Sequence, residues 1–205
     1  MYSFDNGGHT IVVGQTQNGK TYAVEHLLKV QKRGVLFFNV QLENLTGYIK
    51  VDKKTPFRTI LDLLKKHQKV NYYPSTRSGA QSQELRFIIN QLFENGHFSK
   101  ENFIYVVVDE VHLFKKEALE EICRIATGGL RFGLHGIFLS QRPANMDNTL
   151  MTQSTNVLVF KCNMESQYFK NYDIPIIEIL KQIELNGKYS FCSYDFDKIT
   201  AYKKV

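Results

Sequence analysis

The sequence predicts a single α/β domain in which helices flank a doubly wound, mostly parallel β-sheet that ends in a C-terminal β-hairpin. Two observations lead to this fold class. Short apolar runs alternate with segments of helical periodicity from residue 34 to residue 204. A glycine-rich loop also joins the first apolar run to a helical segment, an arrangement that is typical of parallel sheets.

The composition agrees with one intracellular domain. A chain of 205 residues is long enough for a substantial core, and no repeat or linker divides it, so we expect one domain over residues 1–205. Lys and Arg outnumber Asp and Glu by 26 to 20, and the net charge of +6 favours a polyanionic partner. Cys123, Cys162 and Cys192 lie far apart and indicate core residues in a reducing compartment. No apolar run approaches the roughly 18 residues of a membrane span and no leader follows Met1, so we expect a soluble protein without a transmembrane segment.

The first strand, residues 11–13, leads into the segment GQTQNGKT, which fits the phosphate-loop pattern G-x-x-x-x-G-K-[ST] without a mismatch. The glycines permit a tight turn, and a helix is expected from Lys20 onward, so backbone N–H groups and a helix N-terminus point at one phosphate. Lys20 is expected to reach the β- and γ-phosphates of ATP, and the Thr21 hydroxyl to ligate Mg²⁺. The alternative is a chance glycine turn before a helix. The predicted nucleotide-binding residues are Gly14, Gln15, Thr16, Gln17, Asn18, Gly19, Lys20 and Thr21.

The middle of the chain continues the alternation. An apolar run predicts a strand over residues 35–40, and apolar i, i+3, i+4 spacing predicts helices over residues 56–68 and 81–94. The polar, Gly- and Ser-containing segment NYYPSTRSGAQSQ, residues 71–83, is expected to be a loop.

Five apolar residues predict a strand over residues 104–108 that is buried on both faces, and Asp109 and Glu110 follow it directly. Two carboxylates at the carboxyl end of a central strand are costly unless a cation or a water uses them. Asp109 is therefore expected to hold Mg²⁺ through a water, and Glu110 to polarise the water that attacks the γ-phosphate. The alternative is that both acids only begin the helix expected over residues 116–126. His112 completes DEVH, which resembles the DExH box of two-lobed helicases, but a second lobe does not fit into the rest of the chain.

A third apolar run predicts a strand over residues 136–140, after which Gln141 emerges at the same carboxyl edge. A neutral amide both accepts from the attacking water and donates to a phosphate oxygen, so Gln141 is a candidate sensor of hydrolysis. Its alternative role is to terminate the strand before Pro143. The remaining elements are a strand over residues 156–161, a helix over residues 176–183, and a hairpin of residues 188–193 and 198–203 around the turn YDFD.

The segments GQTQNGKT, VVVDE and LRFGLHGIFLSQRPANMDNTLMTQSTNVLVF together resemble the FtsK–HerA superfamily of P-loop motor ATPases. Within it the chain is most similar to the compact genome-packaging ATPases of tailless icosahedral viruses with internal membranes, particularly the archaeal turreted icosahedral viruses. The resemblance extends from about Thr10 to Phe160, and SQRP after VVVDE is its most specific part. It implies a RecA-like P-loop fold, ring-shaped oligomers that are usually hexamers, and ATP-driven translocation of double-stranded DNA.

The resemblance also implies an arginine that one subunit places in the site of the next. In this family it stands shortly before the strand that ends in the glutamine, a place that Arg131 occupies here. Its guanidinium would stabilise charge on the transferring phosphoryl group. The alternative for Arg131 is an ordinary solvated side chain. Arg142, within SQRP, is the competing candidate, and its alternative role is to brace the loop that Pro143 stiffens.

Three segments are candidates for contact with the DNA backbone. Basic residues gather in YIKVDKKTPFR and LLKKHQK, where they either follow phosphates or form the solvated face of a helix. The expected loop over residues 71–83 is the better candidate because it presents Tyr72, Tyr73 and Arg77, although the tyrosines alternatively pack beneath it. No base-reading motif is found, so backbone contacts with little sequence preference are expected.

The combined prediction is a Mg²⁺-dependent ATPase that forms a homo-oligomeric ring and packages viral double-stranded DNA into a preformed capsid. It would act in the host cytoplasm or at a virion or procapsid vertex, with a capsid or membrane-associated capsid protein as partner. A cellular or plasmid DNA pump of the same superfamily would show the same motifs. A small-molecule P-loop kinase would carry an arginine-rich lid, which the sequence lacks, and a non-catalytic adaptor would not need Glu110.

Overall fold

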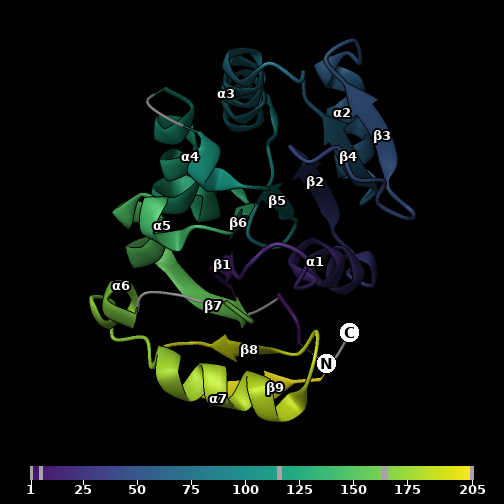
Figure 1. Cartoon of the computed structure of the whole chain (residues 1–205). Helices are drawn as coiled ribbons and strands as arrows, with labels where there is room; N and C mark the ends of the chain where they lie inside the picture. Colours follow the sequence, from purple (N-terminus) through teal and green to yellow (C-terminus); the bar gives the residue numbers. More distant parts are fainter. Residues whose placement is uncertain (1, 5–6, 115–116, 163–165, 204–205) are drawn as a thin grey trace.

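The computed structural model describes residues 2–4, 7–114, 117–162 and 166–203. This part of the chain forms one nine-stranded sheet in the order β3-β4-β2-β5-β6-β1-β7-β8-β9 (Figure 1). The strands up to β7 pair in parallel, whereas β8 pairs antiparallel with both β7 and β9. The strands are β1 (His9–Val13), β2 (Gly34–Phe38), β3 (Ile49–Asp52), β4 (Lys69–Tyr73), β5 (Ile104–Val108), β6 (Leu134–Ser140), β7 (Ser154–Phe160), β8 (Phe191–Tyr194) and β9 (Ile199–Tyr202).

Different helices cover the two faces of the sheet. One face packs against α1 and the N-terminal Tyr2 and Phe4, and the opposite face packs against the other helices (Figure 1). Because alternate residues of a strand point to opposite faces, Val12 belongs to the first core and Ile11 to the second. The helices are α1 (Lys20–Lys29), α2 (Phe57–Lys65), α3 (Ser78–Asn95), α4 (Glu117–Gly128), α5 (Asn148–Gln153), α6 (Ser166–Lys170) and α7 (Ile176–Asn186), with 3₁₀ turns η1 (Val111–Leu113), η2 (Gly129–Phe132) and η3 (Pro143–Asn145).

The strand order brings three polar turns together. β6 lies between β1 and β5, and all three strands run parallel. Their carboxyl ends therefore lie side by side, and they lead into Gly14, Asp109 and Gln141 respectively. The predicted strand-end residues thus meet at one edge of the sheet.

The predicted α/β class, the mostly parallel sheet and the C-terminal hairpin are all confirmed, but the expected loop over residues 71–83 is wrong. Asn71 to Tyr73 belong to β4, and α3 begins at residue 78. Tyr72 is buried and stacks on Phe38, with ring centroids 5.3 Å apart. Neither β3 nor β4 was expected, because lysine and asparagine interrupt their apolar pattern.

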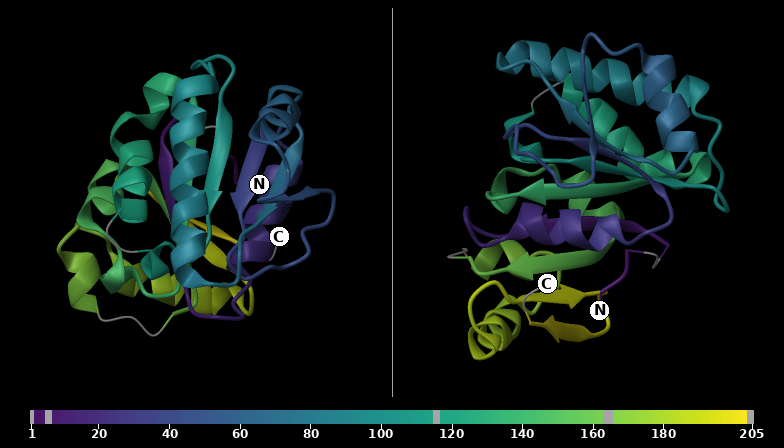
Figure 2. Two further views of the ribbon diagram at one scale, coloured as in Figure 1. Left: turned by 90° about the horizontal axis from the view of Figure 1, so that it is seen from above. Right: turned by 90° about the vertical axis from the view of Figure 1, so that its right-hand side faces the viewer.

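The first described residues of the chain pack beside the hairpin of β8 and β9 (Figure 2). The Tyr2 ring packs edge-on against Phe191 and Tyr202, at centroid distances of 6.4 and 5.8 Å. Tyr2 also packs on Phe4, which contacts Tyr105 of β5, so this aromatic group connects the antiparallel strands to the parallel sheet. Among the described residues, no helix is long and apolar enough to cross a membrane.

Candidate nucleotide-binding and hydrolysis site

The phosphate loop is held tightly against the ends of two strands. The Gly14 N–H donates to the Ser140 carbonyl at 3.4 Å, and the Gln15 N–H to the Lys161 carbonyl at 3.2 Å. A Cβ atom on Gly14 would lie 2.6 Å from that of Phe160, so only glycine fits there. Gly19 has φ +84° and caps α1, which turns the helix N-terminus toward the loop.

Lys20 lies inside this loop. Its side chain is 6 % exposed, and the ammonium donates to the Gln15 carbonyl at 3.0 Å. Burial lowers the pKa of Lys20, while the nearby Glu110 and Asp109 carboxylates act in the opposite direction. The cation therefore lies at the centre of the loop, where phosphate oxygens would meet it.

Asp109 is fully buried, with 0 % of its surface exposed, and neither carboxylate oxygen has a hydrogen-bond partner. Burial and the neighbouring Glu110 and Glu43 carboxylates raise its pKa to about 7. A buried, unpartnered carboxylate is expensive, and a cation or its water shell removes that cost. Asp109 therefore fits a role in holding Mg²⁺, and Thr21, the other predicted ligand, lines the cavity over the phosphate loop. Among the described residues no three His, Cys, Asp or Glu side chains form a protein-only metal site, so the ion would need phosphate and water ligands as well.

Glu110 is held on both carboxylate oxygens. Its Oε1 accepts from Gln41 Nε2 at 2.7 Å and from Gln141 Nε2, and its Oε2 accepts from the Gln141 N–H at 3.3 Å. Nδ1 of His112 lies 3.2 Å from the same Oε2. Glu110 also has φ +49°, a conformation that few residues other than glycine adopt. The local backbone and three neighbouring side chains thus fix the carboxylate that the sequence assigns to water activation.

Gln141 connects the two halves of the site. Its amide nitrogen donates to Glu110, and its Oε1 accepts from the Thr16 hydroxyl of the phosphate loop. A single amide therefore contacts both the loop that would hold phosphates and the carboxylate that would hold water. This is the geometry that a sensor of the γ-phosphate needs.

A cavity of about 720 Å³ opens over the loop and contains residues that were not predicted. Gln41 directly follows the expected strand 35–40, so the rule that identified Gln141 also applies to it. Tyr189 lies between α7 and β8, and the residues next to it in the sequence form no motif that would predict a nucleotide site. The lining residues are Thr16, Gln17, Gly19, Lys20, Thr21, Tyr22, Ala23, Gln41, Glu43, Gln141 and Tyr189.

The segment after β2 is fixed by one backbone carbonyl. The Glu43 oxygen accepts from Asn39 Nδ2 at 2.7 Å, Tyr73 Oη at 2.8 Å and Asn71 Nδ2 at 3.1 Å. Asn71, a polar residue inside a buried strand, thus anchors the wall of the cavity that carries Gln41.

The two candidate arginines lie in different places. Arg142 follows Gln141 and lines a second cavity of about 540 Å³ together with Gln41, Glu110 and His112, so it lies beside its own site. Arg131 is exposed on η2, before the first residue of the seven-residue strand β6. A strand of that length spans about 20 Å, which puts Arg131 at the opposite edge of the sheet from Gln141.

Comparison with known proteins identifies the fold. The genome-packaging NTPase B204 of Sulfolobus turreted icosahedral virus 2, in complex with ATP-γS, matches with a TM-score of 0.67 and 15 % identity over 97 % of this chain and 98 % of that one. B204 of Sulfolobus turreted icosahedral virus, described as a DNA-packaging ATPase, matches with a TM-score of 0.64 and 14 % identity over 98 % and 100 %. EssC, ATPases 2 and 3, of Geobacillus thermodenitrificans matches with a TM-score of 0.55 and 13 % identity over 100 % of this chain and 40 % of that one.

No curated protein sequence matches the chain. The family model described as AAA domain, in contrast, matches residues 4–143, which is more than half of the chain and includes the phosphate loop, Asp109, Glu110 and Gln141. The fold agrees with the family that the FtsK–HerA motifs indicate. The chain therefore belongs to the AAA-domain family and is a P-loop ATPase with the fold of the B204 packaging enzymes.

Proposed function

We propose that this ATPase moves double-stranded DNA and packages a viral genome into a preformed capsid, as a homo-oligomeric, hexameric ring. The observation that carries the proposal is the match to B204 over nearly the whole length of both chains, since a shared motif alone would match only one part. The SQRP segment after VVVDE supports the same superfamily. The place of action would be the host cytoplasm or a virion or procapsid vertex, with a capsid or membrane-associated capsid protein as partner.

Hydrolysis would use the strand-end residues in distinct roles. Lys20 would hold the β- and γ-phosphates, and bound Mg²⁺, held by Thr21 and through a water by Asp109, would neutralise phosphate charge. Glu110 would accept a proton from the attacking water. At the same time the water oxygen would bond to the γ-phosphorus, and the bond between the γ-phosphorus and the ADP oxygen would break. Gln141 would report the presence of the γ-phosphate through its contacts to Glu110 and Thr16.

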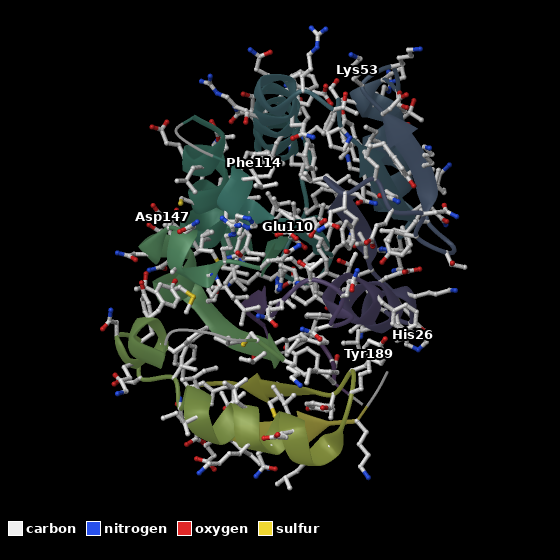
Figure 3. All side chains as sticks on the ribbon, viewed as in Figure 1. His26, Lys53, Glu110, Phe114, Asp147 and Tyr189 are labelled. Carbon is white, nitrogen blue, oxygen red and sulfur yellow. The ribbon has the colours of Figure 1, made fainter. Side chains whose placement is uncertain are left out.

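DNA contact is proposed for the basic edge of the molecule at β3 and α2. Lys53, Lys54, Arg58 and Lys65 are exposed there, and Figure 3 shows Lys53 at that end of the molecule, away from Glu110. The Lys50 ammonium instead lies over the Tyr73 ring at 3.9 Å. Such an edge would bind phosphates without reading bases, so binding should weaken steeply with salt.

The test is steady-state ATP hydrolysis at low salt over a range of protein concentrations, with and without long linear double-stranded DNA. A ring motor predicts stimulation by DNA and a rate that rises more than linearly with protein concentration. A rate per subunit that rises with concentration but does not change with DNA would favour a secretion ATPase, because EccC of Thermomonospora curvata, which shares the fold with a TM-score of 0.50, is described as a Type VII secretion ATPase. A rate per subunit that changes neither with protein concentration nor with DNA would overturn the ring and the DNA substrate together.

A further inference from the structure

The cavity over the phosphate loop is larger than a triphosphate needs. At about 720 Å³ it has the size of a site for a whole nucleotide-sized ligand. Gln41 and Gln141 also line the cavity beside Glu110, so this part belongs to the γ-phosphate. Two tyrosines, Tyr22 and Tyr189, line the cavity around the start of α1.

Both tyrosines lie beside the phosphate loop. Tyr22 directly follows Thr21 in the first turn of α1 and stacks on His26, with ring centroids 6.1 Å apart and planes 22° apart. Tyr189 approaches from the opposite end of the sequence, and its Cδ1 would lie 3.5 Å from a Cβ atom on Gly19. Figure 3 shows Tyr189 and His26 on the same side of the molecule, away from Glu110.

The Tyr189 ring is held in a defined position. Its backbone has φ +68°, and the Lys188 ammonium lies 4.8 Å from the ring centroid. The next residue, Ser190, is buried and donates to the Ile183 carbonyl at 2.8 Å, which ties the loop to α7. The two rings nevertheless stay accessible, at 56 % for Tyr22 and 38 % for Tyr189.

We propose that Tyr189 stacks on the base of the bound nucleotide and that Tyr22 forms the facing wall of this base site. A nucleotide whose phosphates lie on the loop must direct its ribose and base into the rest of the cavity, where these rings lie. Gln17 lines this cavity as well, and it lines a neighbouring cavity together with Tyr189. Stacking uses the π-face, which every base has, so the Tyr189 ring should contribute equally to the binding of ATP and of GTP.

This inference rests on nucleotide binding and not on DNA packaging, so its test contains no DNA. Isothermal titration with Mg²⁺ compares ATP with tripolyphosphate, which has phosphates but no base. Tyr189→Leu should weaken ATP binding about tenfold and leave tripolyphosphate binding unchanged, since one base–aromatic stack contributes about that much. Tyr189→Phe, which keeps the ring, should bind ATP like the original chain, and Phe196→Leu on the distant β8–β9 turn is the matched control.

A spectroscopic arm uses the fact that the chain contains no tryptophan. In Tyr189→Trp the single indole should be quenched by ATP and by GTP but not by tripolyphosphate, and Phe196→Trp should respond to none of them. An equal response to tripolyphosphate, or unchanged ATP affinity in Tyr189→Leu, would overturn the base site. Equal loss of ATP and tripolyphosphate binding in Tyr189→Leu would also overturn it, because the residue would then only support the loop.

Discussion

Nε2 of Gln41 lies 2.7 Å from Oε1 of Glu110, so a residue that follows β2 holds the carboxylate that follows β5. The two strands are direct neighbours in the sheet, which is why their carboxyl ends meet. With Gln141 and His112 on the same carboxylate, an incoming water must share or displace one of these donors. The position of Gln41 should therefore affect the chemical step more than ATP binding.

Gln41→Leu keeps the volume of the side chain and removes its donor. We expect kcat to fall about tenfold, because a less well-positioned base transfers protons less efficiently. The affinity for ATP should change little, which calorimetry measures independently of turnover. A rise in kcat would contradict positioning and would mean that Gln41 restrains Glu110.

Glu110→Gln tests the base directly. The amide keeps the shape of the carboxylate but does not accept a proton, so we expect retained ATP binding and hydrolysis lowered by 10² to 10⁴. Glu120→Gln makes the same chemical change on the exposed face of α4 and should leave turnover unchanged. Undiminished turnover in Glu110→Gln would remove Glu110 from the mechanism.

Asp109→Asn should stabilise the metal-free protein at neutral pH while it weakens Mg²⁺ binding. The pKa of Asp109 is about 7 in the fold and 3.8 ordinarily, so the folded state binds the proton more tightly. Its ionisation therefore costs stability as the pH rises from 3.8 to 7, by up to about 4 kcal/mol above pH 7. Thermal unfolding without Mg²⁺ should give Asp109→Asn the higher midpoint at pH 8, with the advantage shrinking toward pH 5. A lower midpoint at every pH would contradict this balance.

His9 produces the opposite pH dependence. It is buried at the amino end of β1, where Nδ1 accepts from the Gly136 N–H at 2.9 Å, and burial together with His135 lowers its pKa to about 4. In the unfolded chain His9 takes up a proton near pH 6.5, whereas in the fold it does so only near pH 4. Neutral His9 therefore contributes to the free energy of unfolding above pH 6.5, and about 3 kcal/mol of that contribution is lost as the pH falls toward 4. The measurement is the free energy of unfolding in urea as a function of pH, in Asp109→Asn, which lacks the opposing titration of Asp109. This free energy should fall between pH 6.5 and pH 4, and the fall should be smaller when His9→Gln is added. An unchanged slope would exclude His9.

The sequence predicts the parts of the site that follow short apolar strands. Asp109, Glu110 and Gln141 are recognisable because an apolar run predicts a strand and the residue after it has a defined edge. Gln41 also directly follows an expected strand. An amide at a strand end does not by itself indicate a function, however, and its contact with Glu110 is visible only in the structure. Tyr189 could not be predicted, because its place beside Gly19 comes from the packing of the C-terminal strands onto β7 and not from any local pattern.

The same reasoning explains the misread segment over residues 71–83. Asn71 breaks an apolar run and suggests a loop, yet its amide donates to the Glu43 carbonyl inside the fold. A buried polar side chain is acceptable when its hydrogen bond is made. That bond joins residues 28 positions apart, so local sequence gives no sign of it.

The position of Arg131 gives a test of the proposed ring. At the opposite edge of the sheet from Gln141, it does not reach its own site, so any catalytic role must be in a neighbouring subunit. Arg131→Ala and Glu110→Gln should each lose most ATPase activity alone, since an arginine finger contributes roughly 10³ to 10⁵. In an equal mixture, a Glu110→Gln subunit supplies its Arg131 to the intact Glu110 site of an Arg131→Ala neighbour, which restores about a quarter of the sites in a randomly mixed ring. Arg142→Ala mixed with Glu110→Gln is the parallel experiment, and recovery there instead would make Arg142 the residue that acts between subunits. Mixtures without recovery would show that each site is completed within one chain.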